Sequence, residues 1–419
     1  MRSTQIFPPV ALATSFLLVG CGGGGEAGGG DGDTLTLAAT SNEKAALDVV
    51  VPAFEEANPD INIEYTTSSL DEYQTTTRTQ LSSGTASDIV FVWPGTGNPM
   101  TVDTVGSGGF VDDISDHVGD LPEGVAQVME VDGTVYGAPI SFSGIGAVYN
   151  TTAMEETGLT APTTRTELLE FCQAAQDAGK TAFALGAQTN WVTQLVNYAL
   201  TPTLVYGPNP DFAQDMAAGE ATFADSGWED AMNQYLEMQD AGCFQDNPLG
   251  TDYERSLSMV AQGEALGVVQ VNSAVPQILD QAPEGTELNM LPLPATDDPE
   301  ETRMAGAAGS AYAVNASSDN KENALKFIDF IQSPEGMNLY AETNAALPAI
   351  PNDEYETHPA LTVLQEHQQE GKTDPFMDQL WPNARVQQAH FAAVQELLGG
   401  QTTVEDALAQ MDSAYAQGE

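Results

Sequence analysis

Residues 34–93 read TLTLAATSNEKAALDVVVPAFEEANPDINIEYTTSSLDEYQTTTRTQLSSGTASDIVFVW, and their pattern of apolar residues indicates the fold class. Apolar runs at 34–39, 61–65 and 88–93 have the length and composition of strands. Between the first two runs, Leu47, Val50, Val51 and Phe54 are spaced three and four residues apart, which predicts a helix, and a polar helix is expected at about 70–81. Strands that alternate with helices favour a mostly parallel sheet covered by helices, so we predict an α/β fold.

The rest of the chain continues the alternation. Thr164 and Glu167 have capping-box spacing and predict that a helix starts there and ends at Gly179. The apolar run 265–271 predicts a strand. Further strands are expected at 288–292 and 310–314, and further helices at 228–242, 324–331 and 403–415.

The first residues have the features of a secretory signal. Arg2 precedes an apolar stretch at 10–19, which ends in Leu18-Val19-Gly20-Cys21. A basic start, a short apolar core and small residues before a cysteine indicate a bacterial lipobox, in which the thiol of Cys21 receives a lipid. The alternative is an ordinary cleaved signal with a cysteine present by chance. We predict a lipoprotein signal peptide at residues 1–21.

A glycine-rich segment follows the lipobox. Residues 22–33 read GGGGEAGGGDGD, a composition that cannot bury apolar surface and predicts a flexible tether. No later segment has eighteen consecutive apolar residues, so no transmembrane helix is predicted. We expect the chain to contact the membrane only through its lipid anchor, on the outer face of the cytoplasmic membrane.

The charge of the chain is strongly negative. It has 61 acidic and 11 basic residues, a formal net charge of −50. Nucleic acid is therefore an unsuitable partner, because binding phosphates requires a basic surface. The acidic residues are spread along the chain, which fits a protein exposed to high salt, where repulsion is screened.

Two cysteines remain after Cys21. Cys172 and Cys243 lie near predicted helices, and an exported protein meets an oxidising compartment in which disulfides persist. A bridge between them and two buried free thiols are both consistent with the sequence.

Motifs of catalysis are missing from the sequence. The four histidines (His117, His358, His367 and His390) do not form an HExxH or comparable metal-binding spacing. There is also no GxSxG elbow, P-loop, GxGxxG after a strand, or EF-hand loop. We therefore expect no enzyme activity, no metal and no cofactor.

Several segments, in order, resemble family 1 extracellular solute-binding proteins, the sugar-binding components of ABC importers, of which maltose-binding protein is the familiar member. The motif VDGTVYGAP followed by AVYN, at 131–150, resembles the family's "dGk-yg-P … lyyN" signature. Weaker matches span most of the chain after the tether, at 84–90, 162–168, 259–265, 313–331 and 403–408.

The resemblance implies a periplasmic-binding-protein-like fold, with two α/β lobes, a hinge and a ligand cleft between them. Lobe 1 would comprise 34–143 and 295–347, and lobe 2 would comprise 144–294 and 348–419. It also implies that the protein, expected to be a monomer, closes around a small carbohydrate and presents it to ABC transporter permease subunits.

Candidate ligand-binding residues follow from sugar chemistry and from the family's loops. Sugars stack on aromatic rings and hydrogen-bond to planar polar side chains. Trp191 corresponds to a stacking aromatic in maltose-binding protein, and Trp381 lies in the region that brings a late aromatic into the cleft. Polar candidates follow the ends of predicted strands, where α/β sheets bind ligands. The full set is Asn42, Glu43, Trp93, Asn98, Ser143, Gln188, Asn190, Trp191, Asn272 and Trp381.

The ligand expected from the sequence is a neutral carbohydrate. Ser143 stands where maltose-binding protein has a carboxylate and Val275 where it has a tryptophan, which argues against maltose and for another oligosaccharide, such as an α-galactoside. Only Lys44, among the basic residues, neighbours a candidate loop, whereas an anionic ligand calls for basic groups. The alternatives are a non-sugar solute such as glycerol phosphate, and a surface enzyme or adhesin that reuses the fold.

The charge leads to a testable prediction. Raising KCl from about 0.1 M to about 1 M shortens the screening length from about 10 Å to about 3 Å. Repulsion among the acidic side chains then weakens, so the melting temperature of the mature domain should rise. Differential scanning calorimetry measures it, and equal melting temperatures across the series would contradict the saline-habitat hypothesis.

Overall fold

The computed structural model describes residues 34–417. The predicted signal peptide, Cys21 and the glycine-rich tether lie outside the described residues, so these predictions stay as they are. Within the described part, no helix combines the length and the apolar character that crossing a membrane requires.

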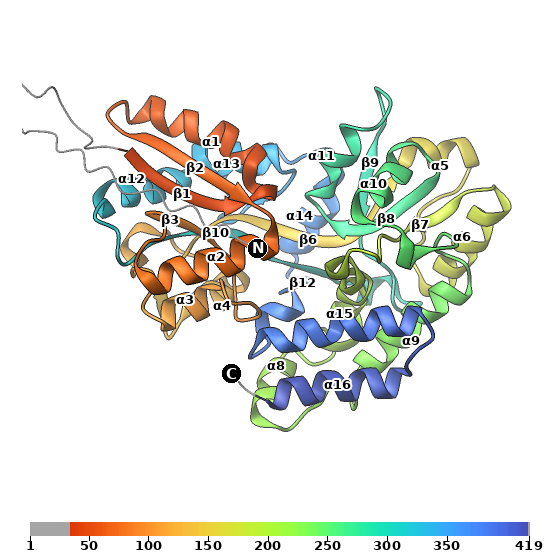
Figure 1. Cartoon of the computed structure of the whole chain (residues 1–419). Coiled ribbons are helices and arrows are strands. Elements are labelled where there is room, and N and C mark those ends of the chain that lie inside the picture. The colour runs from red at the N-terminus through yellow and green to blue at the C-terminus, as the bar shows by residue number, and fades with distance from the viewer. Residues whose placement is uncertain (1–33, 418–419) are drawn as a thin grey trace, which may run out of the picture. The chain divides into compact units, whose positions relative to one another are not determined.

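The first 60 described residues fold as the opening stretch predicts. β1 (Thr34–Thr40), β2 (Asn62–Ser68) and β3 (Ile89–Val92) pair in parallel, with β1 between the other two. α1 (Lys44–Ala57) and α2 (Leu70–Ser83) connect them. Figure 1 shows this group in red and orange. The helices bury the apolar residues that the periodicity identified, which confirms the α/β prediction for this part.

Two long strands occupy the middle of the sheet. The strand order is β2-β1-β3-β10-β6-β8-β7. β10 (Met304–Val314) pairs antiparallel with both β3 and β6 (Ala138–Asn150). β6 pairs antiparallel with β8 (Ala265–Val271), which pairs in parallel with β7 (Thr181–Ala184). The shorter strands β9 (Leu288–Leu291) and β11 (Leu347–Pro348) pair with β6, and β12 (Thr373–Asp374) pairs with β10.

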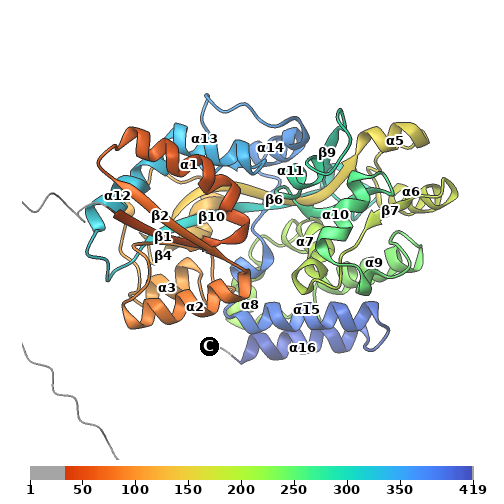
Figure 2. The same cartoon turned by 45° about the horizontal axis from the view of Figure 1, so that its top comes forward.

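The remaining helices lie along both halves of this sheet (Figures 1 and 2). Their bounds are α3 (Val102–Ser107), α4 (Glu123–Met129), α5 (Thr151–Thr157), α6 (Arg165–Asp177), α7 (Leu195–Thr201), α8 (Phe212–Ala218), α9 (Trp228–Asp240), α10 (Tyr253–Ala261), α11 (Ala274–Leu279), α12 (Lys321–Ile331), α13 (Pro334–Thr343), α14 (Thr362–Gln369), α15 (Ala384–Leu398) and α16 (Val404–Ala416). The capping box at Thr164 and Glu167 is present at the start of α6, as predicted.

The apolar side chains form two buried clusters. The first gathers around β1, β2, β3, α1 and α12, and the second around β7, α6, α9, α15 and α16. β6 and β10 contribute to both, with Phe142 and Tyr312 in the first cluster and Tyr149 and Ala305 in the second. These two strands therefore carry the chain from one core to the other.

β10 begins earlier than the sequence predicts. The expected strand covers 310–314, whereas β10 starts at Met304. The added residues, Met304 to Gly309, are mostly alanine and glycine, which have low strand propensity. Tertiary contact overrides this preference, because β10 lies between β3 and β6 and its small side chains are buried there.

Cys172 and Cys243 form a disulfide, so the structure selects the bridge from the two alternatives. The bond joins α6 to the turn that follows α9, across 71 residues of chain, with a Cα–Cα distance of 4.7 Å. Both residues are fully buried in the second core.

The disulfide should stabilise the second core. Closing a loop of this length restricts the unfolded chain, and bridges of this kind typically contribute about 2–4 kcal/mol. We expect the Cys172→Ser/Cys243→Ser variant to lose a free energy of unfolding in that range, measured by urea denaturation. A midpoint and slope identical to those of the unaltered protein would contradict this expectation.

Candidate functional site

A β-bulge lies where the two central strands pass from one core to the other. The register between β10 and β6 shifts around Gly309, so that Ser310 pairs with Ser141 while Ala307 pairs with Ser143. A Cβ atom on Gly309 would lie 2.3 Å from Ser143 Oγ and 3.2 Å from Ser141 Oγ, so only glycine fits. The bulge brings three serine side chains to one place, and bulges often mark functional sites.

Glu43 lies next to this bulge. It follows β1 and is 6% exposed. Its carboxylate accepts hydrogen bonds from the hydroxyls of Tyr340 (2.5 Å), Tyr312 (3.4 Å) and Ser310 (3.5 Å). The predicted candidate is thus held by residues of β10 and α13, with both carboxylate oxygens engaged.

The surroundings of Glu43 change its protonation. Burial raises its pKa to about 7, and the three hydroxyl donors only partly offset this effect. No basic side chain in residues 34–417 forms an ion pair with it. Glu43 is therefore a carboxylate kept in an apolar and hydroxyl-rich environment rather than neutralised by a cation.

The loop after β3 packs against a C-terminal segment. The amide of Thr96 donates to the carbonyl of Gln379 (3.1 Å), and its hydroxyl donates to the carbonyl of Trp381. A Cβ atom on Gly95 would lie 2.1 Å from Gln379 O, and one on Gly97 would lie 2.2 Å from Asp378 O. The glycines therefore permit a close approach of two backbones that are about 280 residues apart in the sequence.

This C-terminal segment also contacts the bulge. The turn Met377–Leu380 places the side-chain amide of Gln379 3.1 Å from the carbonyl of Ala308, to which it donates. Met377 and Trp381 are buried in the second core. The segment consequently joins the second core to both the bulge of β10 and the loop after β3.

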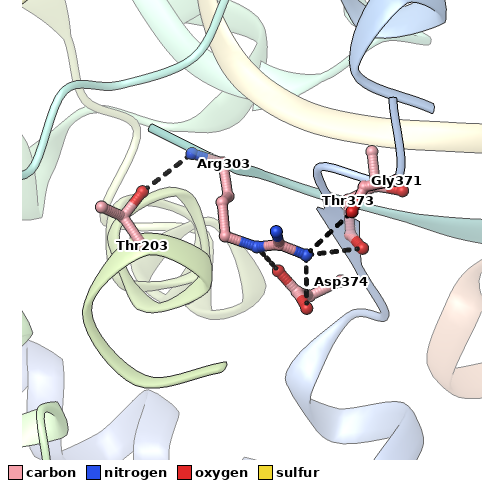
Figure 3. Close-up of polar contacts among 5 residues, drawn as sticks. All are labelled: Thr203, Arg303, Gly371, Thr373 and Asp374. Carbon is pink, nitrogen blue, oxygen red and sulfur yellow. Dashed lines mark hydrogen bonds and ion pairs between the residues drawn. The ribbon is translucent and has the colours of Figure 1, made fainter. Parts of the chain in front are cut away.

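An ion pair fixes the start of the segment, as Figure 3 shows. The guanidinium of Arg303 donates to Asp374 through Nε (2.7 Å) and Nη2 (3.2 Å), and Nη2 also lies near the carbonyls of Gly371 and Thr373. The amide of Arg303 donates to Thr203 Oγ1 (3.0 Å). Burial raises the pKa of Asp374, and Arg303 counteracts that rise. The fork holds β12 beside the first residues of β10.

Two of the three aromatic candidates are half-buried and pack against different cores. Trp93 is half-buried against the first cluster, with ring centroids 4.6 Å from Phe91 and 5.9 Å from Tyr73, in edge-to-face geometry. Trp191 is half-buried against the second cluster, 5.0 Å from the ring of Tyr253. Each ring is thus held by a neighbour and keeps part of its surface exposed.

The polar candidates beside these tryptophans differ in their contacts. Asn98 Oδ1 accepts a hydrogen bond from the amide of Met100 (2.8 Å), which shapes the loop after β3. Asn190 Oδ1 accepts from the amide of Trp191 (2.8 Å). The side chains of Asn42, Gln188 and Asn190 are exposed.

Two candidates lie inside the protein and make structural contacts. Asn272 is fully buried; its Oδ1 accepts from the amide of Gly144 (2.8 Å) and its Nδ2 donates to the carbonyl of Ala345 (2.6 Å). Trp381 is 2% exposed and packs among Phe223, Trp228 and His390. Their ligand contacts remain predictions, but in this arrangement Asn272 joins chain segments and Trp381 fills the second core.

Nine of the ten Lys and Arg residues in 34–417 have contacts that do not involve the carboxylate or the serines of the bulge. Lys44, the one basic neighbour of a candidate loop, pairs with Asp48 on the outer surface. Ion pairs also engage Arg165, Arg255, Arg303, Lys321, Lys326 and Lys372. Arg78 lies over the ring of Phe110, and Lys180 donates to the carbonyl of Gly263.

Between residues 34 and 417, no group of three His, Cys, Asp or Glu side chains is placed to hold a metal ion. The site is therefore built from carboxylates, hydroxyls, amides and aromatic rings.

Comparison with known proteins agrees with this architecture. The family model described as "Bacterial extracellular solute-binding protein" matches residues 38–338. The chain belongs to this family. Its fold is that of the periplasmic-binding-protein-like sugar-binding proteins, as the resemblance implied.

Individual relatives are distant in sequence. A curated relative, the multiple sugar-binding protein of Streptococcus mutans, is 22% identical over 344 residues, which are 80% of each chain. A solved structure of a solute-binding protein in complex with raffinose has a TM-score of 0.77 at 18% identity, covering 92% of this chain and 99% of the other. A sugar transporter protein of Bacillus licheniformis, in complex with stachyose, has a TM-score of 0.74 at 20% identity, covering 92% and 99%.

The position of Glu43 leads to a prediction on pH and stability. Its pKa is about 7 in the folded protein and about 4.3 in an unfolded chain. The folded state therefore binds the proton more tightly, and this stability is present below about pH 4 and lost as pH rises to about 7. We expect Glu43→Gln to match the unaltered protein at about pH 4 and to be more stable at pH 8, by about 3 kcal/mol.

The control for this measurement is Glu170→Gln, which removes a charge from the exposed face of α6. Urea denaturation at both pH values gives the two free energies. A Glu43→Gln protein that is less stable than the unaltered protein at pH 8 would show that the three hydroxyl donors outweigh the effect of burial.

Proposed function

We propose that this protein is the substrate-binding lipoprotein of an ABC importer. It captures a neutral carbohydrate, an oligosaccharide in our proposal, and delivers it to membrane permease subunits. Lobe 1 (34–143 and 295–347) and lobe 2 (144–294 and 348–419) close around the sugar, and Cys21 anchors the protein outside the cell. Family membership and the sugar-binding relatives support this proposal.

The observation that carries the neutral ligand is the charge pattern at the bulge. Glu43 and three serines of β6 and β10 meet there, and no ion pair joins Glu43 to a basic side chain within residues 34–417. A phosphate or carboxylate would lie next to a buried acidic group without a counter-charge, which is unfavourable. Sugar hydroxyls both donate and accept hydrogen bonds, and they match carboxylates, hydroxyls and amides.

The half-buried tryptophans supply the other requirement of a sugar site. Trp93 packs on the first core and Trp191 on the second, so closure of the lobes would bring an aromatic face from each side to the ligand. Stacking of a pyranose on such rings buries apolar C–H surface. The solved structures with raffinose and stachyose are of similar proteins, which supports oligosaccharides as the first ligands to test.

Thermal-shift screening of the mature domain in high salt tests the proposal. The panel contains raffinose, stachyose, xylo-oligosaccharides, chito-oligosaccharides and galactose. A ligand at about a hundredfold its Kd stabilises the folded state by about 2.7 kcal/mol, so the melting temperature should rise with one class of sugar. Trp93→Ala and Trp191→Ala should lose this shift, whereas Leu70→Ala, an exposed apolar position on α2, should keep it.

Other outcomes separate the alternatives. A shift with glycerol phosphate and none with any sugar would keep the fold and overturn the carbohydrate ligand. Chromatography of the sugar after incubation with the protein would detect any chemical conversion, and conversion would support a surface enzyme. Absence of any shift across the panel would contradict the proposed receptor role.

A further inference from the structure

Asp378 is a half-buried carboxylate at the junction of the two cores, and the sequence patterns did not identify it. It lies in the turn Met377–Leu380, against the loop after β3, where a Cβ atom on Gly97 would be 3.2 Å from Asp378 Cβ. No ion pair engages it within residues 34–417. Tyr198 and Gln387 are its hydrogen-bonding neighbours, but they offset only part of the rise in pKa that burial causes.

The neighbours of Asp378 are polar groups that the protein leaves partly unsatisfied. Tyr198 is 1% exposed, and its hydroxyl, which lies beside Asp378, has no hydrogen-bond partner of good geometry. Gln379 is 6% exposed, and its Oε1 also lacks a partner. Gln387, on α15, lies between Asp378 and Gln194, to which it donates (3.3 Å). Buried polar atoms generally have a hydrogen-bond partner. The lack of one at these atoms indicates that a group outside the described chain, such as a bound ligand, supplies it.

The segment that carries Asp378 is held firmly. The Arg303–Asp374 fork fixes its start, the Gln379 amide binds the bulge carbonyl of Ala308, and Thr96 binds its backbone. A carboxylate on a rigid support next to orphan donors and acceptors is preorganised for a ligand that carries several hydroxyls.

We propose that the Asp378 carboxylate accepts hydrogen bonds from two adjacent hydroxyl groups of the bound sugar, with Tyr198 and Gln387 beside them, and thereby selects neutral sugars with an unmodified vicinal diol. This assignment rests on the proposed carbohydrate-binding function. A carboxylate can accept from two hydroxyls at once, and such charge-assisted bonds are stronger than neutral ones. A uronic acid or sugar phosphate is rejected because its charge would meet that of Asp378.

The apo protein offers a control on folding. Burial raises the pKa of Asp378 to about 6, so at pH 8 the group is ionised in the folded protein and its buried charge lowers the free energy of unfolding. Asp378→Asn removes that charge at nearly constant volume. We expect the melting temperature of this apo variant at pH 8 to equal or exceed that of the unaltered protein.

Isothermal titration calorimetry at pH 8 tests the contact. The probe is whichever sugar of the panel (raffinose, stachyose, xylo-oligosaccharide, chito-oligosaccharide or galactose) binds most tightly. We expect Asp378→Asn and Asp378→Ala to raise its Kd at least tenfold, and Glu170→Gln to leave it unchanged.

Monodeoxy analogues of the sugar complete a double-mutant cycle. The analogue that lacks the contacted hydroxyl should bind the unaltered protein at least tenfold more weakly, and lose little further affinity in Asp378→Ala.

The outcomes distinguish this assignment from the proposed function. If the unaltered protein binds a sugar and both Asp378 variants bind it within about twofold, the assignment is overturned and the receptor role stands. A uniform loss of affinity for the sugar and all its deoxy analogues in Asp378→Ala also overturns the contact, because it shows an indirect structural effect. If the unaltered protein binds no sugar, both proposals fail.

Discussion

The antiparallel pairing of β6 with β10 is the constraint on which the rest of the structure depends. These two strands are shared by both hydrophobic clusters, and every other strand of the main sheet is added to one side or the other. Their register places Ser141 and Ser143 beside Gly309, and the bulge exists because glycine leaves room for the serine side chains. The same small side chains that make β10 a poor isolated strand make it a close-packed central one.

The acidic composition makes the few buried acidic groups informative. Most acidic side chains lie on the surface, where water and salt stabilise their charges. Asp374 is buried but has Arg303 as its partner, so its role is to hold the segment that carries β12. Glu43 and Asp378 are different, because burial raises the pKa of each carboxyl group and no basic side chain of the described residues forms an ion pair with either. Such groups cost stability in the ionised form, and they gather where chain segments from both cores meet.

Of the candidate residues, the sequence predicted which segments approach the bulge better than it predicted individual contacts. Glu43 and the loop that follows Trp93 could be predicted because side chains after parallel strands lie at one edge of a sheet. Asn272 follows a strand as well, yet its amide joins β6 to the chain before β11, which no local pattern reveals. Trp381 and Asp378 lie three residues apart, and only packing shows that the indole belongs to the core while Asp378 is half-buried, with its backbone against the loop after β3.

Local periodicity, capping and short motifs were sufficient to predict the alternation of strands and helices, the start of α6, the lack of known catalytic motifs and the family. Three-dimensional contacts were needed to show that Cys172 and Cys243 are bonded, that β10 begins at Met304, and which acidic groups lie in the interior without a cation. The physical reason is that bonding, register and burial depend on atoms brought together from distant parts of the chain, whereas periodicity and capping act within a few residues.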